Sequence, residues 1–190
     1  MSIPINPATT EAKLHDLIAN RWSPRSFDPT HIISSEEMNS LLEAARWSPS
    51  WNNDQPWRFL FGHRGDKNFE GFVSTLKDFN LVWAPNASAL ILICATGKKV
   101  TKIETFDTGL AVGAITFQGL SMGFHTRQMG GFEKDKISEM FTLPENIEPI
   151  VLIAVGKIKD TADLSEDFQK RENAPRSRKP LSELMLKGLN

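Results

Sequence analysis

Residues 21–27 read Arg-Trp-Ser-Pro-Arg-Ser-Phe, and residues 48–57 read Ser-Pro-Ser-Trp-Asn-Asn-Asp-Gln-Pro-Trp. The first stretch places two guanidinium groups and a hydroxyl group within five residues, a combination that suits a phosphate or a carboxylate. The second stretch is a turn that is rich in amide side chains and is closed by a tryptophan. Together they predict one segment that binds an anion and another that offers hydrogen bonds to a flat polar ring.

The chain of 190 residues has the size and composition of one globular domain. It is 40% apolar, with 22 basic and 23 acidic side chains, as expected for a soluble protein with one ordinary core. A near-neutral chain does not favour nucleic-acid binding. The first residues lack a secretory signal pattern, and the longest apolar run, residues 87–95, is too short to span a bilayer. We therefore expect one domain over residues 1–190, in the cytoplasm, with no nucleic-acid or membrane partner.

Helices and strands alternate at close spacing along the sequence. Apolar spacing predicts helices over residues 9 or 10 to 20, 67–78, 107–122, 133–141 and 182–187, and strands over 58–61, 88–95, 124–128 and 149–155. Ser34 and Glu37 fit a capping box at the start of a further helix. Gly109 and Gly113, with alanines beside them, predict that another backbone packs closely against the helix over 107–122. The predicted class is α+β around one small sheet.

Several common chemistries lack their motifs. The four histidines are scattered, and neither Cys-x-x-Cys nor His-Glu-x-x-His occurs, so we expect no metal site. Cys94 lies within an apolar run and is expected to be a buried strand residue rather than a nucleophile. No phosphate-binding glycine loop and no convincing acid–base pair is present. Anion-binding arginines without a catalytic side chain suggest that a cofactor carries the reaction.

A basic cluster lies near the end of the chain. Lys170, Arg171, Arg176, Arg178 and Lys179 occur within ten residues and are opposed only by Glu172. Such a cluster is either a solvated basic surface or a second anion-binding segment. The sequence pattern alone leaves both interpretations open.

Five motifs occur in one order along the chain: Arg21-Trp-Ser-x-Arg25-x-Phe27, Leu42-Glu-Ala-Ala-Arg46, Ser48-Pro-Ser50, Asn53-x-Gln-Pro-Trp57 and Pro175-Arg-Ser-Arg178-Lys-Pro-Leu181. Each motif alone is weak, but in this order they resemble the FMN-dependent nitroreductase family over residues 12–185. The resemblance implies a nitroreductase-like fold, with a central mixed, mainly antiparallel sheet flanked by helices. It also implies an intertwined homodimer in which the tail over about 156–190 reaches the partner subunit.

The resemblance assigns the anion-binding residues to the FMN phosphate and ribityl chain. Arg21, Ser23, Arg176 and Arg178 match positions that bind this part of the cofactor, and a phosphomonoester with nearly two negative charges rewards such contacts. Trp22 stands where the family has a polar or basic residue, so we expect only its backbone N–H to donate. Without the family context, a surface ion pair or a helix C-terminal charge would be the alternative for Arg21.

Arg25 matches a basic position near the pyrimidine edge of the flavin. Because reduced flavin carries negative charge at N1 and C2=O, the resemblance implies that Arg25 tunes the cofactor.

Pro49, Ser50, Trp51 and Asn53 match a loop that reaches the flavin from the other subunit. Trp51 replaces a residue that is often small, so the contacts of this loop differ from the usual pattern. The alternative is a polar turn whose Trp57 is simply buried.

Three further positions match the isoalloxazine site. Asn80 matches a hydrogen-bonding asparagine, with an exposed helix-ending Asn as the alternative. Gly130 and Gly131 fall where the family approaches flavin N5 with a backbone N–H, with a plain strand-to-helix turn as the alternative. A glycine keeps the donor but lacks the carboxylate of some relatives, which predicts a different substrate range.

The implied activity is that of an oxidoreductase without a catalytic side chain. Hydride passes from NAD(P)H to flavin N5, and a nitroaromatic, quinone or similar electron-poor acceptor then takes the electrons, in a ping-pong cycle. Three alternatives stay open: a specialised relative that dehalogenates, oxidises or fragments its flavin; a flavin-binding sensor whose Trp51 and Trp83 obstruct the cleft; and an anion-binding scaffold without flavin.

Overall fold

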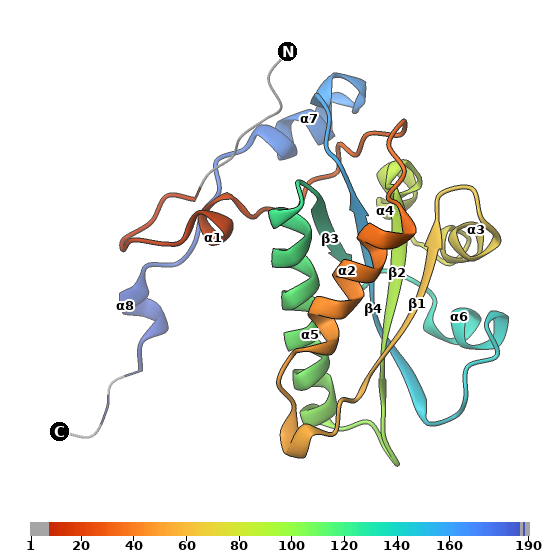
Figure 1. Ribbon diagram of the computed structural model, residues 1–190. Coiled ribbons are helices and arrows are strands. Elements are labelled where there is room, and N and C mark those ends of the chain that lie inside the picture. Colours follow the sequence, from red (N-terminus) through yellow and green to blue (C-terminus); the bar gives the residue numbers. More distant parts are fainter. Residues whose placement is uncertain (1–7, 187, 189–190) are drawn as a thin grey trace.

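Four antiparallel strands form the sheet in the part of the chain that this computed structural model describes, residues 8–186 and 188 (Figure 1). The strands lie side by side in the order β1-β2-β4-β3, with the bounds β1 Trp57–His63, β2 Ala89–Thr96, β3 His125–Met129 and β4 Ile147–Gly156. The four expected strands are confirmed, with their ends shifted by one to a few residues. The α+β class is also confirmed, and every strand pair among these residues is antiparallel.

The central position of β2 explains its continuous apolar sequence. Successive residues of a strand point to opposite faces of a sheet, so Leu90 and Leu92 belong to one core and Ile91 and Ile93 to the other. Cys94 is 2% exposed, and burial raises the pKa of its thiol to about 12. The expectation that Cys94 is a buried strand residue is therefore confirmed.

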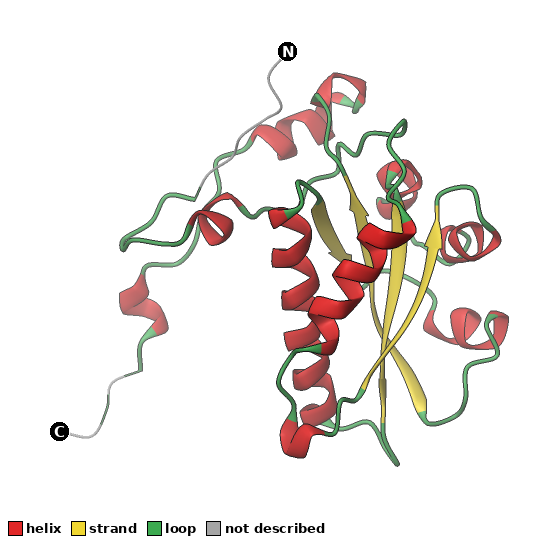
Figure 2. Cartoon of the chain, viewed as in Figure 1, coloured by secondary structure: helices red, strands yellow, loops and turns green. Residues whose placement is uncertain are grey.

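Helices cover both faces of the sheet (Figure 2). α2 (Ser35–Arg46) and α5 (Lys102–Ser121) pack on one face, and α3 (Lys67–Val73), α4 (Asn80–Trp83) and α6 (Lys134–Met140) pack on the other. The result is three layers with a core on each side of the sheet. Within residues 8–186 and 188, no helix combines the length and the apolar character that crossing a bilayer requires.

Capping boxes begin the two longest helices. The Ser34 hydroxyl accepts from the Glu37 amide at 3.2 Å, and the Glu37 carboxylate accepts from the Ser34 amide at 2.8 Å, which confirms the predicted start of α2. Thr101 and Glu104 form a second box. α5 therefore begins at residue 102 rather than at the expected residue 107, because its first turn is secured by polar contacts and not by apolar spacing.

The first helix is shorter than expected. α1 comprises only Asp16–Asn20 and does not begin near residue 9. The His15 ring caps it by accepting a hydrogen bond from the Leu17 amide at 3.2 Å. Leu14 and Ile18 are 40% and 47% exposed, so the apolar face that suggested a longer helix is not buried by the described residues. A short helix without such packing is marginal.

The third helix also ends early. α3 stops at Val73 instead of residue 78, because the following backbone pairs with the segment that precedes α6. Leu76 forms an antiparallel bridge with Phe132, and the Glu133 amide donates to the Thr75 carbonyl at 2.9 Å. These contacts use the backbone groups that a longer helix would need.

The tail after β4 contains two helices. α7 (Glu166–Asn173) was not expected, because Phe168 is its one large apolar residue and no apolar periodicity marks it. α8 (Leu181–Leu184) confirms the last expected helix in part, and residue 187, where that helix was expected to end, lies outside the described residues. Figure 1 shows α8 projecting away from the layered body, whereas α1 lies next to α5.

Small residues of α5 face two different environments. A Cβ atom at Gly119 would lie 3.5 Å from a methyl group of Leu41, so the close approach of α2 occurs there. A Cβ atom at Gly109 or Gly113 would meet nothing within 4 Å. Within this chain, the close contact expected near residues 109–114 is therefore found further along the helix. The open side of α5 carries an apolar stripe, formed by Ile103, Phe106, Leu110 and Phe117.

Candidate functional site

Arginines from distant parts of the chain line one cavity of about 270 Å³. Arg21 and Arg25 follow α1, Arg171 lies on α7, and Arg176 and Arg178 lie between α7 and α8. The structure thus brings together the early and late arginines that the sequence presented as separate clusters. The basic cluster of the tail is therefore more than a solvated surface.

Positive charge is concentrated in this cavity. Burial, followed by the charges of Arg176 and Arg178, lowers the pKa of the Arg21 guanidinium. Burial and then the charge of Arg178 lower the pKa of Arg176 in the same way. The two side chains also donate to neutral groups, Arg21 to the Ser23 hydroxyl at 3.2 Å and Arg176 to the Ala19 carbonyl at 2.7 Å. A bound anion would relieve the mutual repulsion, so the cavity is suited to one.

Trp22 contributes little of its ring to the cavity surface. The side chain is 8% exposed, and its ring stands edge-on to that of His125 at a centroid distance of 6.3 Å. That the backbone N–H of Trp22 donates to a ligand stays a prediction. His125 is itself enclosed, and burial lowers its pKa to about 4.

Arg25 is held by α7. Its Nη1 donates to Glu172 Oε1 at 2.8 Å, and its backbone N–H donates to Glu172 Oε2 at 2.9 Å. The guanidinium also lies 5.6 Å from the centroid of the Phe168 ring. The side chain of Glu172 is fully buried, whereas that of Arg25 is 17% exposed. The expected cation is thus present at the cavity, but as half of a buried ion pair.

Arg127 of β3 contacts the segment that carries Arg21 and Arg25. Its guanidinium donates to the Ser23 carbonyl and lies 5.3 Å from the centroid of the Trp83 ring. Burial, and then the charge of Arg25, lowers its pKa to about 10, opposed by Glu172. Trp83 is 1% exposed and stacks with Phe27. The suggestion that Trp83 obstructs a cleft is therefore wrong, because its ring belongs to the core.

Three residues of this region were not predicted from the sequence as site residues: Arg127, Arg171 and Glu172. Glu172 had a visible signal, since it is the one acidic residue within the basic cluster. Arg127 had a weaker signal, a charged residue within a predicted strand. Neither signal identifies a partner, because the contacts of both residues cross more than a hundred positions of sequence.

The loop over residues 49–53 lies away from the arginine cavity. Figure 1 shows the turn after α2 beside the N-terminal end of α5, whereas the segment after α1 passes the other end of this helix. Pro49, Ser50 and Trp51 line an apolar groove of about 450 Å³ together with Phe106 and Leu110. Within a single chain, the structure does not bring this loop to the arginine cavity.

Hydrogen bonds give this loop a defined shape. The Ser50 hydroxyl accepts a hydrogen bond from the backbone N–H of Gln55 at 3.0 Å. The backbone carbonyl of Asn53 accepts one from the side-chain amide of Gln55 at 2.9 Å. Asn52 and Asn53 have φ angles of 47° and 58°, in the left-handed region that asparagine adopts more readily than most residues. Trp57 is 4% exposed and begins β1, as the alternative interpretation of this turn expected.

Asn80 and Gly131 are brought together. The Asn80 amide donates to the Gly131 carbonyl at 3.4 Å, and a Cβ atom at Gly131 would lie 3.2 Å from the Asn80 amide nitrogen. Gly130 lies beside them, where an added Cβ would meet open space. Asn80 is the first residue of α4 and is half-buried, so it does not end a helix. The neighbouring Phe79 lies 5.5 Å from the Arg171 guanidinium, which connects this group to the arginine cavity.

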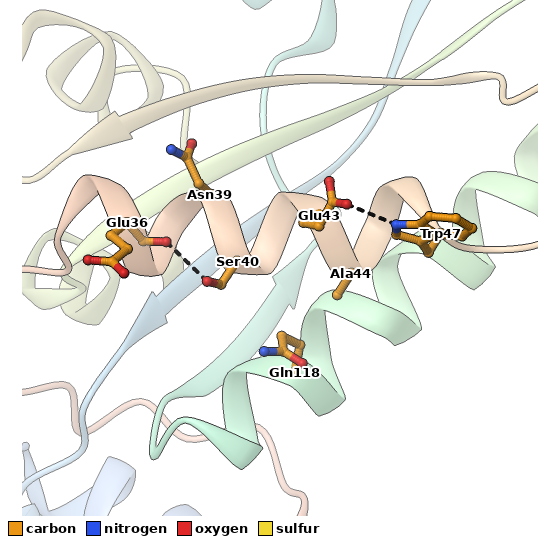
Figure 3. Close-up of a pocket in the computed structure, with 7 residues that line it drawn as sticks. All are labelled: Glu36, Asn39, Ser40, Glu43, Ala44, Trp47 and Gln118. Atoms are coloured by element: carbon orange, nitrogen blue, oxygen red, sulfur yellow. Dashed lines mark hydrogen bonds between the residues drawn. The ribbon is translucent and has the colours of Figure 1, made fainter.

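A larger groove of about 720 Å³ runs between α2 and α5 (Figure 3). It contains none of the predicted site residues. Trp47 Nε1 donates to the Glu43 carboxylate at 2.8 Å, and the Ser40 hydroxyl donates to the Glu36 carbonyl at 3.1 Å. With two carboxylates and no basic side chain lining it, this groove is unsuited to a phosphate. No group of three or more potential metal ligands occurs among the described residues, in this groove or elsewhere.

The layered antiparallel sheet and the arginine cavity define an α+β protein with a basic site built from distant parts of its chain. The nitroreductase family model matches residues 18–70. An oxygen-insensitive NADPH nitroreductase of Helicobacter pylori is 34% identical over an alignment of 187 positions; the alignment covers 77% of this chain and 88% of that protein.

Solved structures agree with this match. The crystal structure of an oxidoreductase containing FMN is 32% identical, with a TM-score of 0.89 over 100% of this chain and 98% of the other. A nitroreductase family protein from Streptococcus pneumoniae shares the fold, with a TM-score of 0.74, 18% identity and coverage of 91% and 98%. This chain belongs to the nitroreductase family.

Proposed function

We propose that this protein is an FMN-dependent oxidoreductase that uses NAD(P)H to reduce nitroaromatic, quinone or similar electron-poor acceptors. The observation that carries the proposal is the meeting of Arg21, Arg176 and Arg178 in one cavity. Arginine forks suit a phosphomonoester, which carries nearly two negative charges. The similarity to an oxidoreductase containing FMN and to an NADPH nitroreductase supports the choice of ligand and reductant.

The residues of the cavity suggest how each part of FMN is bound. Arg21, Arg176 and Arg178 bind the phosphate, with the Ser23 hydroxyl and the Trp22 backbone N–H as further donors. The pKa values of Arg21 and Arg176 are lowered first by burial and then by neighbouring arginine charges, and a bound anion would offset both effects, which supports this assignment.

A second set of residues orients the ring system. With FMN bound, Arg25 would lie at the pyrimidine edge, Asn80 would donate a hydrogen bond to the ring, and the backbone N–H groups of Gly130 and Gly131 would serve as donors to N5. When bound, FMN supplies the N5 atom that accepts hydride from NAD(P)H and the electron pair that the acceptor receives. The chain contributes position, charge and exclusion of solvent, so no side chain is proposed as an acid or a base. The two substrates use the same site in turn, in a ping-pong order.

The proposed site is completed by a homodimer. The apolar stripe of α5 offers Phe106, which is 67% exposed, and the tail offers Leu186, which is 95% exposed. Burying both against a second copy would remove this area from water. In such a dimer the flavin would be reached by a loop of the partner subunit, which contains Pro49, Ser50, Trp51 and Asn53. The tail over about 156–190 would pack against the partner subunit. We propose a single domain per subunit and a cytoplasmic location, where NAD(P)H is available.

The test begins with the absorption spectrum of the purified protein. We expect a yellow protein with bound FMN that is bleached by NADH or NADPH and regains its colour when a nitroaromatic compound or a quinone is added. A colourless protein whose melting temperature does not rise with added FMN would overturn the proposal.

A flavin-binding protein without turnover is the second candidate. The exposure of Trp51, 62%, favours it, because a large ring at the edge of the loop could cover the flavin and exclude substrates. The same measurement separates the two functions. A yellow protein that neither nicotinamide bleaches would favour the binding protein over the reductase.

A further inference from the structure

Arg25 forms an ion pair with Glu172, a carboxylate at the end of a helix where negative charge is usually disfavoured. Glu172 lies in the last turn of α7, where the helix dipole disfavours negative charge. Its side chain is nevertheless fully buried. Burying a carboxylate at such a position is costly unless cations and hydrogen-bond donors surround it. The surroundings of Glu172 therefore explain its presence.

Those surroundings belong to the segment that carries the cavity arginines. Both oxygens of Glu172 accept from Arg25, one from the guanidinium at 2.8 Å and one from the backbone N–H at 2.9 Å. Phe168, one turn earlier on α7, packs against the same guanidinium at 5.6 Å. α7 thus determines both the direction in which Arg25 points and the charge that accompanies it.

Arg127 contacts the same segment from β3. It donates to the Ser23 carbonyl, two residues before Arg25, and it stacks on the buried ring of Trp83. Arg25 is therefore held from α7 on one side, while its own segment is held from β3 on the other. A cation fixed in this way presents a constant field to whatever occupies the cavity.

We propose that Glu172 is a positioning residue that offsets the charge of Arg25 and so keeps the reduction potential of bound FMN low. The inference rests on the proposed function, because it takes Arg25 to face the pyrimidine edge of the flavin. Negative charge accumulates at that edge when the flavin is reduced. A lone Arg25 cation would favour the reduced cofactor, and the pair with Glu172 favours it much less.

Three variants test this charge balance through the potential of bound FMN, measured by titration with a reference dye. Glu172→Gln leaves Arg25 uncompensated, so we expect the preference for reduced over oxidised FMN to rise at least about tenfold, which is about 30 mV for a two-electron couple. Arg25→Gln leaves the carboxylate and should shift the preference by a similar factor in the opposite direction. In Arg25→Gln/Glu172→Gln, where both charges are absent, the potential should return to within about threefold of the wild-type preference.

The matched control is Glu166→Gln, which removes the same charge from an exposed position of α7. Its potential should stay at the wild-type value. A double variant whose potential equals that of Arg25→Gln would overturn the proposal, because Arg25 would then act without Glu172. The double variant also replaces a buried ion pair by neutral groups, which proteins tolerate better than breaking the pair. It keeps the test decisive if Glu172→Gln does not fold.

Failure of the proposed function is recognised separately. A wild-type protein that binds no FMN overturns the function, and the inference with it. A wild-type protein that binds FMN, with three variants of unchanged potential, overturns the inference alone. Melting temperatures of the flavin-free variants distinguish loss of folding from a change in the field at the flavin.

Discussion

The backbone N–H of Trp51 donates to Oδ2 of Asp107 at 2.9 Å, which joins the turn after α2 to α5. Asp107 is 5% exposed, an unusual burial for an acidic residue. Its carboxylate accepts from the loop that we propose reaches the flavin of the second subunit. The position of that loop therefore depends on α5.

We expect Asp107→Ala to lower the free energy of unfolding by about 1 to 3 kcal/mol, because a hydrogen bond to a charged group is lost and the Trp51 amide loses its acceptor. Asp107→Asn keeps an oxygen that can accept the bond and should cost less. Urea unfolding of the two variants measures the difference. Equal stability of Asp107→Ala and the wild type would show that this bond does not secure the loop.

Arg21→Ala and Arg178→Ala should each weaken FMN binding by about 1 to 3 kcal/mol, roughly fivefold to somewhat over a hundredfold, if both are charge-assisted phosphate contacts. Binding is measured by the quenching of FMN fluorescence. Lys170→Ala, which removes a charge of the same cluster outside the cavity, is the control. Riboflavin lacks the phosphate, so its affinity should change little. Unchanged FMN retention in both arginine variants would refute the assignment.

His125 should make the protein less stable as the pH falls. Burial lowers its pKa from 6.5 to about 4, so between these values the unfolded chain binds a proton that the folded chain does not. The stabilisation is complete above pH 6.5 and is lost as the pH falls towards about 4, by at most about 3 kcal/mol. Urea unfolding at a series of pH values measures the slope.

His125→Phe is the matching variant, because it keeps a flat ring beside Trp22 but cannot titrate. Its stability should change less than that of the wild type between pH 6.5 and 4.5, above the range in which carboxylates dominate. Parallel curves for the two proteins over this interval would exclude His125 as the titrating group.

Phe106→Glu should dissociate the proposed dimer, because it places a charge in the middle of the apolar stripe of α5. Light scattering during size-exclusion chromatography measures the mass, and FMN retention should fall with it. Lys67→Glu, which introduces the same carboxylate on the opposite side of the sheet and changes the net charge by one unit more, is the control. A monomeric wild-type protein, or a variant that stays dimeric, would contradict the proposed assembly.

Most of the layered fold could be predicted from the sequence, because the strands and helices that form its cores have short, local sequence patterns. The apolar run of β2 and the box formed by Ser34 and Glu37 can be recognised within a few residues. Helix ends were less predictable where distant contacts decide them. α3 stops because Leu76 pairs with Phe132, and no local pattern shows that pairing.

The candidate site divides in the same way. Arg21 and Arg178 could be named from short motifs whose composition suits an anion. Glu172 and Arg127 could not, because their role arises from contacts with residues that are far away along the chain. Exposed apolar residues of α1 and α5 were misleading in a different sense, since spacing reports an apolar face but not whether a single chain buries it.

The arginines of the cavity come from both ends of the chain, so the cavity is completed late in biosynthesis. The sheet is complete once β4 has been made, whereas Arg176 and Arg178 lie on the segment that follows α7. A ribosome-bound chain can therefore assemble its strands before it can acquire a ligand at this cavity. A protease that removed everything beyond Gly156 would leave the four strands together but delete one side of the cavity. During synthesis, binding of the ligand would therefore show that translation had passed Arg178.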